Sequence, residues 1–249
     1  MVARGISFNS SKRSSSKIQK SYTKKCPFLG YVIISAHKKF NMHPETINKK
    51  TRECLEILSS QSWLKSFYLA GGTALALHLG HRLSYDLDFF SSEGFDPKHL
   101  RNLLQPLGDL TIEMEKPNML WVILNETKLS FFQYSYPLLE NKISFGPIDL
   151  ASIKDISCMK LDTISSRGSR KDFVDLYFIL KEGYGFEDIW KWFEKKYHGI
   201  KFNKAHILKS LTYFEDAEKE PPLNMIREAD WNEVKRIFQA EAKKVILSS

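Results

Sequence analysis

Two aspartates, Asp86 and Asp88, lie on either side of one leucine in a short apolar run that is typical of a β-strand. Side chains two residues apart on a strand share a face, so both carboxylates point the same way while their neighbours enter the core. Adjacent carboxylates repel each other unless a cation or a hydrogen-bond donor compensates. Because oxygen ligands suit hard divalent cations, the pair predicts a metal site, most naturally for Mg²⁺.

A second motif, Gly71-Gly72, precedes the aspartates and separates an expected strand from a short helix over residues 73–79. Glycines at such a turn let backbone N–H groups approach a phosphate at the positive end of the helix. A lone Gly-Gly is usually a tight turn, and a lone Asp-x-Asp is usually a solvated strand end. Together, on either side of one short helix, the two motifs predict a nucleoside triphosphate site.

A third candidate is Lys160, which falls on the apolar stripe of a helix expected over residues 152–165. A lysine there is costly unless it reaches solvent or meets an anion. Two interpretations remain open: Lys160 contacts a triphosphate, or it is a structural lysine paired with a carboxylate such as Asp172. The residues alone favour a structural interpretation of Asp172 and Asp175, since helix N-termini attract carboxylates.

The segments 71–75 and 80–90 together resemble the AbiEii/AbiGii toxin family of the polymerase-β-like nucleotidyltransferase superfamily. A second block, 159–161 followed by 167–177, resembles the downstream motifs of that family, a lysine on one helix and an aspartate on the next. The resemblance implies an α+β fold: a polymerase-β-like nucleotidyltransferase domain with a mixed sheet and flanking helices, followed by a helical C-terminal domain that completes the active site.

The resemblance also assigns roles to individual residues, with Asp175 as a second choice after Asp172. It implies that the catalytic residues are Asp86, Asp88, Lys160 and Asp172, and that the first two bind the metal.

Phosphate contacts form the second set. Arg82 lies in the loop just before the metal strand, from which a guanidinium could reach phosphate or substrate. The resemblance adds the glycine turn and the residue after it, so the expected nucleotide-binding residues are Gly71, Gly72, Thr73 and Arg82.

One departure concerns a third carboxylate that superfamily members commonly place on a later strand. Ser130 occupies the place where it would be expected. Either another acid substitutes, namely Glu113, Glu115 or Asp172, or the transfer chemistry is weak or absent.

The implied function is Mg²⁺-dependent transfer of NMP from an NTP to an acceptor hydroxyl, by the toxin of a type IV toxin–antitoxin or phage abortive-infection system. The implied partners are a cognate antitoxin protein and, as acceptor, a tRNA end or another RNA. One alternative is a catalytically weak nucleotide-binding or protein-binding module of the same fold. Another is a metal-dependent glycosyltransferase that uses Asp-x-Asp to hold a nucleotide sugar.

The elements that must position these residues are strands and helices as far as about residue 149, and helices only after it. The chain therefore divides into an α+β domain over 42–150 and a helical domain over 151–249. The pattern predicts strands over 67–70, 86–90, 110–115, 119–124 and 128–136, and helices over 44–58, 73–79, 96–106, 152–165, 171–181, 186–197, 203–218 and 231–247.

Charge is distributed unevenly along the 249 residues. The formal net charge is +8, but nine of the 37 Lys and Arg lie in residues 1–44, which contain no acid; the remaining 28 face 29 Asp and Glu. The overall basicity therefore gives no argument that the folded body binds nucleic acid. Residues 1–41 are expected to be a disordered basic tail; a transit peptide or a translation start placed too far upstream of Met42 would give the same composition.

Three widely spaced cysteines form neither a disulfide framework nor a zinc cluster, which favours a cytoplasmic protein. The longest apolar stretch, over residues 28–36, is about half of the ~20 residues needed to span a bilayer. No membrane partner is expected.

Overall fold

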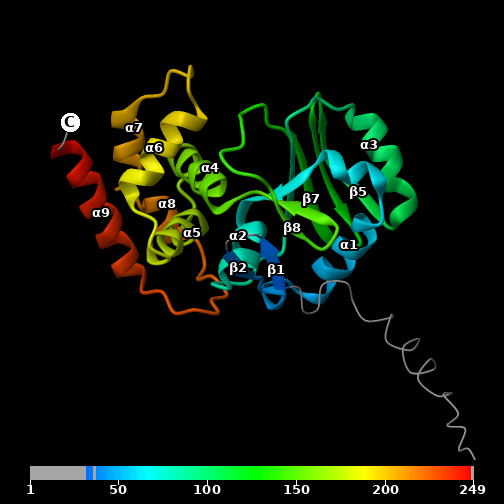
Figure 1. Ribbon diagram of the computed structural model, residues 1–249, viewed down its shortest axis with the longest axis horizontal. Helices are drawn as coiled ribbons and strands as arrows, with labels where there is room; N and C mark the ends of the chain where they lie inside the picture. The colour runs from blue at the N-terminus through cyan, green and yellow to red at the C-terminus, as the bar shows by residue number, and fades with distance from the viewer. Residues whose placement is uncertain (1–31, 36–37, 248–249) are drawn as a thin grey trace, which may run out of the picture.

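The computed structural model describes residues 32–35 and 38–247, with side chains from Met42 onward. A mixed sheet with α1 and α3 lies on one side of the molecule, and helices α4 to α9 gather on the other (Figure 1). Helix α2 lies between the two groups, in contact with α4 and α5 as well as with β3 and β4. The predicted order, an α+β part followed by helices, is confirmed.

The main sheet has seven strands in the order β5-β6-β7-β4-β3-β9-β8. Two neighbouring pairs are parallel, β4 with β7 and β3 with β9, and the other pairs are antiparallel. The strands are β3 (Tyr68–Ala70), β4 (Leu87–Ser91), β5 (Leu110–Lys116), β6 (Met119–Leu124), β7 (Thr127–Gln133), β8 (Ile143–Phe145) and β9 (Ile148–Leu150).

The helices begin and end where side chains or backbone conformation provide caps. Asp96 accepts from the backbone of Lys98 at the start of α3, and Ser152 accepts from Asp155 at the start of α4. Gly80 ends α2 in the left-handed conformation, φ 64°. The helices are α1 (Lys49–Ser59), α2 (Gly71–Leu79), α3 (Pro97–Leu104), α4 (Ile153–Ser166), α5 (Arg170–Lys181), α6 (Phe186–Lys196), α7 (Lys204–Ser210), α8 (Glu215–Lys219) and α9 (Trp231–Leu247), with 3₁₀ turns at Pro44–Thr46, Ser62–Ser66 and Gln105–Leu107.

The expected disorder of residues 1–41 is wrong at two places. Strands β1 (Val32–Ser35) and β2 (Lys38–Asn41) pair in antiparallel register, as the β-branched run Val-Ile-Ile favours. The rest of that prediction lies outside the described residues.

Three further differences concern where a helix begins, the division of one helix into two, and a hairpin that was not predicted. Helix α2 already begins at Gly71, so the glycines form its first turn rather than a break before it. The single helix expected over 203–218 is two short helices, α7 and α8. The hairpin β8–β9 was not predicted, because three-residue strands are too short to show an alternation.

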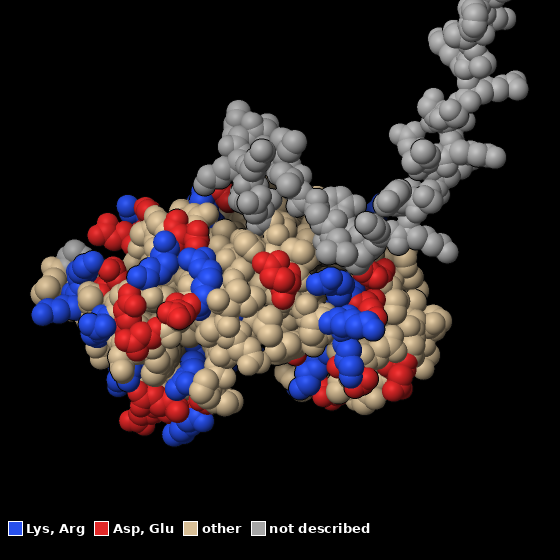
Figure 2. All heavy atoms as spheres, turned by 90° about the horizontal axis from the view of Figure 1, so that it is seen from below, with Lys and Arg blue, Asp and Glu red and all other residues tan. Residues whose placement is uncertain are grey.

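The apolar core is one continuous cluster that includes buried side chains from the sheet and from α4 to α9. The domain boundary at residue 150 therefore stays a prediction. Basic and acidic side chains are interspersed on the face drawn in Figure 2, as the balanced charge of residues 45–249 suggests. Within the described residues, no helix is both long enough and apolar enough to cross a bilayer.

Candidate active site

The two aspartates lie at the start of β4, where the sheet meets α2. Asp86 is exposed and Asp88 half-buried, and one residue separates them, so both face the same side. Asp88 pairs in register with Ser130 on the parallel neighbour β7. The sequence-based placement of Ser130 beside the aspartates is thus correct, and the position carries a hydroxyl where a third carboxylate was sought.

The environment of Asp88 disfavours its charged form. Burial raises the pKa of the Asp88 carboxyl and the charge of Asp86 raises it further, whereas Lys160, a hydrogen bond from Ser130 and Lys171 act in the opposite direction without cancelling the effect. A cation at this place would stabilise the carboxylate form of Asp88.

The glycine turn lies directly against this carboxylate. Gly71 has φ +68°, and a Cβ there would lie 2.7 Å from Asp88 Oδ2. A Cβ on Gly72 would lie 2.4 Å from Arg82 Nη2. Both positions therefore require glycine, the first for its backbone conformation and both for space. The turn brings the N-terminus of α2 into contact with one carboxylate and one guanidinium.

Thr73 does not face the site. Its hydroxyl is buried, donates to the backbone carbonyl of Asp86, and bonds Ser84 Oγ at 2.8 Å. Thr73 therefore ties α2 to the segment that carries Asp86, and its predicted part in nucleotide binding stays a prediction.

Asp175, on α5, is the centre of a buried ionic network. Its Oδ1 accepts from Arg82 Nε at 2.6 Å and from His81 Nε2 at 2.8 Å, and its Oδ2 accepts from Arg82 Nη2 at 2.9 Å and lies 2.5 Å from Lys160 Nζ. Burial alone would raise the pKa of Asp175, but Arg82 and Lys160 outweigh it and hold that pKa well below its usual range. The carboxylate is therefore ionised at neutral pH.

Asp172, one turn earlier, belongs to the same network. It accepts from Lys160 Nζ at 2.8 Å and from Arg167 Nε at 2.9 Å. Burial raises the pKa of Asp172, but Lys160 and Arg167 lower it below the usual value. Lys160 is only 4% exposed, and its contacts match the structural interpretation of that residue, although it also faces a cavity.

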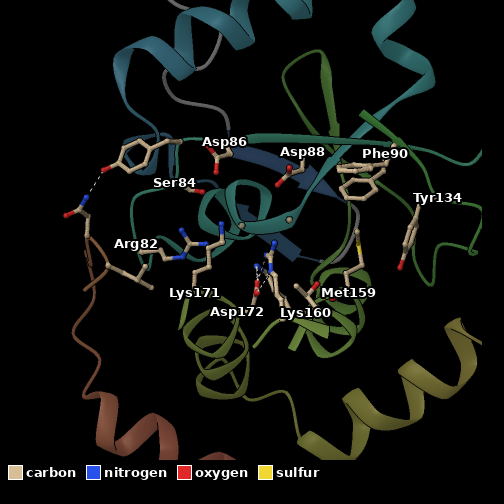
Figure 3. Close-up of a pocket in the computed structure, with 18 of the residues that line it drawn as sticks. Arg82, Ser84, Asp86, Asp88, Phe90, Tyr134, Met159, Lys160, Lys171 and Asp172 are labelled. Atoms are coloured by element: carbon tan, nitrogen blue, oxygen red, sulfur yellow. Dashed lines mark hydrogen bonds and ion pairs between the residues drawn. The ribbon is translucent and has the colours of Figure 1, made fainter. Parts of the chain in front are cut away.

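This cavity, of about 490 Å³, joins the aspartates, the glycine turn and the network. Figure 3 shows Arg82, Asp86 and Lys171 on one side of the cavity and Phe90, Tyr134 and Met159 on the other. Its walls come from β4, β7, α2, α4, α5 and the segment before α9. The lining residues are Gly71, Gly72, Arg82, Ser84, Tyr85, Asp86, Asp88, Phe90, Phe132, Gln133, Tyr134, Met159, Lys160, Thr163, Arg167, Lys171, Asp172, Pro222, Leu223 and Asn224.

The apolar side of the cavity is aromatic. Phe90 stacks on Phe132 with ring centroids 5.3 Å apart, and the Tyr134 ring meets Phe90 edge-on at 5.5 Å. Phe131 is completely buried in the core. The aromatic residues of the segment over 131–136 are therefore divided between two environments, since Phe131 belongs to the core whereas Phe132 and Tyr134 line the cavity.

A connecting segment, Pro222 to Ile226, crosses the loop that precedes β4. The backbone N–H of Leu83 donates to Asn224 O at 2.8 Å, and that of Ile226 donates to His81 O at 2.9 Å. The Asn224 side chain donates to the Tyr85 hydroxyl at the mouth of the cavity. The C-terminal part thus holds the loop that carries Arg82.

Of the predicted site residues, seven line the cavity: Gly71, Gly72, Arg82, Asp86, Asp88, Lys160 and Asp172. Thr73 does not, and neither do Glu113 and Glu115, which lie on β5 at the far edge of the sheet. Asp172, the remaining substitute for the third carboxylate, is engaged by Lys160 and Arg167.

Sequence reasoning missed Arg167 and Lys171 as lining residues and ranked Asp175 below Asp172. The position of Lys171 directly before Asp172 in the sequence was a signal that could have found it, but nothing in the sequence indicates that Asp175 binds Arg82, 93 residues away.

Comparison with known proteins gives matches to one family and one relative at the level of sequence. The family described as nucleotidyl transferase AbiEii toxin, type IV toxin–antitoxin system, matches residues 53–119. An uncharacterized protein of Aquifex aeolicus (strain VF5) is 40% identical over 205 residues, which cover 80% of this chain and 98% of the relative.

Two solved structures are more distant. MenT4, a nucleotidyltransferase toxin from Mycobacterium tuberculosis H37Rv, is 11% identical with TM-score 0.47, over 79% of this chain and 88% of that one. The Megavirus polyadenylate synthase is 18% identical with TM-score 0.40, over 53% of this chain and only 31% of that one. With the glycine turn, the paired aspartates and the downstream lysine and aspartates at one cavity, and with the family match over the first of these motifs, the chain belongs to the AbiEii nucleotidyltransferase toxin family.

Proposed function

We propose that this cytoplasmic nucleotidyltransferase transfers NMP from an NTP to an acceptor hydroxyl, with Mg²⁺ bound by Asp86 and Asp88. The observation that carries the proposal is the opposition of charges across one cavity. In Figure 3, Asp86 and Asp88 form the upper wall of the cavity, and Arg82, Lys160 and Lys171 lie on the wall below them. Arg167 also lines the cavity. A metal-bound triphosphate is complementary to both walls.

The residues present fit a magnesium ion. Asp88 is half-buried next to the exposed Asp86, and burial together with the charge of Asp86 raises the pKa of Asp88, so a cation beside the two carboxylates would favour their ionised form. Among the described residues, no group of three or more His, Cys, Asp or Glu forms a metal cluster, so two carboxylates are the available protein ligands. Mg²⁺ is commonly bound by one or two carboxylates, with water and phosphate oxygens completing the coordination. When bound, the ion would neutralise charge that develops on the transferred phosphoryl group.

The protein groups around the ion would bind and orient the substrate. The backbone N–H groups of Gly71 and Gly72, at the N-terminus of α2, would donate to phosphate oxygens, and Arg82 and Lys160 would hold positive charge behind them. The acceptor hydroxyl attacks the α-phosphate, and pyrophosphate leaves. The network around Asp175 would keep the cations in place, so that little reorganisation is needed during transfer.

The acceptor and the protein partner are proposed from the family description, which names a type IV toxin–antitoxin system. We propose a tRNA end or another RNA as acceptor and a cognate antitoxin as partner. The interspersed charges on the face in Figure 2 provide no continuous basic surface for RNA there.

One observation favours a second candidate, a nucleotide-binding or protein-binding module with weak catalysis. Ser130 stands beside Asp88 where a third carboxylate would assist the attacking hydroxyl, and no other free carboxylate approaches from the sheet. Under this alternative NTP binds normally, but transfer is slow or absent.

The test is incubation of the protein with each labelled NTP, total RNA and Mg²⁺, alongside Asp86→Ala and Asp88→Ala. We expect label in RNA with the wild type and none with either variant, and we expect both variants to stay folded because each change relieves carboxylate repulsion. Asp109→Ala, an exposed aspartate outside the cavity, is the control. Full activity of both variants, or their unfolding, would contradict the metal site; NTP binding without transfer by the wild type would favour the weak module.

A further inference from the structure

The four cations that line the cavity differ in their partners. Arg82 pairs with Asp175, Arg167 pairs with Asp172, and Lys160 bridges the two aspartates. The Lys171 ammonium makes no ion pair and no hydrogen bond with the described residues, although its charge acts on Asp88. Lys171 is therefore the cavity cation that is left for a ligand.

The position of Lys171 makes a purely local role unfavourable. It is the second residue of α5, where the helix dipole disfavours a positive charge, and Arg170 precedes it directly. It is half-buried, so its charge is also partly removed from water. An anionic ligand in the cavity would offset both the repulsion from the helix dipole and the partial loss of hydration of the Lys171 ammonium.

The arrangement of the cavity indicates which part of a nucleotide this anion is. In Figure 3, Lys171 lies on the same side as Arg82 and Asp86, while Phe90 and Tyr134 lie on the opposite side, beyond Asp88. Aromatic side chains stack well on nucleobases, whereas a cationic side attracts phosphate. A nucleotide whose α-phosphate lies at the aspartates would therefore direct its remaining phosphates toward Lys171.

We propose that Lys171 binds the β- and γ-phosphates of the substrate, and that it selects a triphosphate over a monophosphate. This inference rests on the proposed function, since it requires an NTP in the cavity. Lys171 acts as a charge-assisted hydrogen-bond donor, and it touches the leaving pyrophosphate rather than the transferred group.

The experiment measures equilibrium binding of the four NTPs, their NMPs and inorganic tripolyphosphate, each with Mg²⁺, to the full chain. For Lys171→Met we expect the Kd for NTP and tripolyphosphate to rise about tenfold or more, with the Kd for NMP unchanged. Lys171→Arg should retain most of the affinity. Lys98→Met is the matched control, because Lys98 is the second residue of α3, exposed and outside the cavity.

A melting curve separates binding from structure. The melting temperature of Lys171→Met should be unchanged or higher, because a cation leaves a helix N-terminus. Unchanged NTP affinity, an equal loss for NMP and NTP, or a lower melting temperature would each overturn the role of Lys171. If the wild type binds no NTP, the proposed function fails and this inference with it; if NTP binds but only acceptor RNA binding responds to Lys171→Met, this inference alone fails.

Discussion

The buried lysines Lys160 on α4 and Lys196 on α6 each form an ion pair with an aspartate, but the surroundings of the two pairs differ. Each is almost completely buried and bonds an aspartate at 2.7–2.8 Å. Lys196 is enclosed: its ammonium also donates to Pro137 O, and its partner Asp155 accepts from the Leu139 backbone. Its charge is balanced by one carboxylate, and it is not among the described residues that line the cavity of the site.

The network around Lys160 is organised differently. Asp172 and Asp175 are shared with Arg82 and Arg167, so three cations face two carboxylates at one wall of a cavity. The wall therefore carries an excess of positive charge, opposite the negative charge of Asp86 and Asp88. The enclosed pair of Lys196 and Asp155 holds the loop before β8 in place. The network at the cavity, which has more cations than carboxylates, is instead suited to bind an anionic ligand.

The largest effect on stability is expected for Lys196→Met. The change leaves Asp155 buried without its cation, which should cost about 3–5 kcal/mol of the free energy of unfolding. Denaturant melts would measure this loss, and activity per folded molecule should stay normal. The double variant Lys196→Met, Asp155→Asn should recover part of the loss, because no uncompensated charge remains. Equal melts for wild type and Lys196→Met would show that the pair is not structural.

His78 provides a third case, a buried titratable group with no ionic partner. Its Nε2 bonds Ala151 O at 2.9 Å, and burial lowers its pKa to about 4. The pKa of His78 is lower in the folded than in the unfolded protein. The free energy of unfolding is therefore at its full value above pH ~6.5 and decreases as the pH falls toward 4. The loss should be about 3 kcal/mol. Unfolding measured against pH should show a shallower decline for His78→Gln than for wild type; identical slopes would assign the acid sensitivity elsewhere.

A smaller loss of stability is expected for Lys160→Met. Asp172 keeps Arg167 and Asp175 keeps Arg82, so the cost should be about 1–3 kcal/mol, below that of Lys196→Met. Nucleotide transfer should fall about tenfold or more, because a charge at the cavity wall is lost. Melts and an incorporation assay measure the two effects. Normal activity per folded molecule would remove Lys160 from the site.

Lys154→Met is the control with the smallest effect. Lys154 lies on the same helix and pairs with the exposed Glu140. Such surface pairs contribute about 0–1 kcal/mol, and transfer should not change. A loss comparable to that of Lys160→Met would mean that the helix, rather than the buried charge, is sensitive.

The sequence predicts those parts of the site that depend on local spacing. The face shared by Asp86 and Asp88 and the burial of Lys160 follow from the periods of strand and helix, and the structure agrees with both. The position of Ser130 beside Asp88 was also correct, although it depended on the family resemblance.

The rest depends on contacts between distant segments. The bond between Asp175 and Arg82 joins residues 93 positions apart, and the orientation of the Thr73 hydroxyl is set by Ser84 and Asp86. Hydrophobic period does not encode such pairings. Lys171 was missed for a related reason, because its lack of a partner becomes visible only when the partners of its neighbours are known.

The hydrogen bonds between the segment Pro222–Ile226 and the loop before β4 have a consequence for how this enzyme can be divided. A fragment that ends after β9 would contain both aspartates, the glycine turn and Arg82, but it would lack the chain that holds Leu83 and Tyr85. It would also lack Asp175, the partner of Arg82, and the cavity cations Lys160, Arg167 and Lys171. Arg82 would then be left without its counter-ion. We therefore expect the smallest catalytic unit to extend beyond residue 226, and grafting the motif-bearing half alone onto another protein would transfer the proposed metal ligands without the cations proposed to hold the substrate.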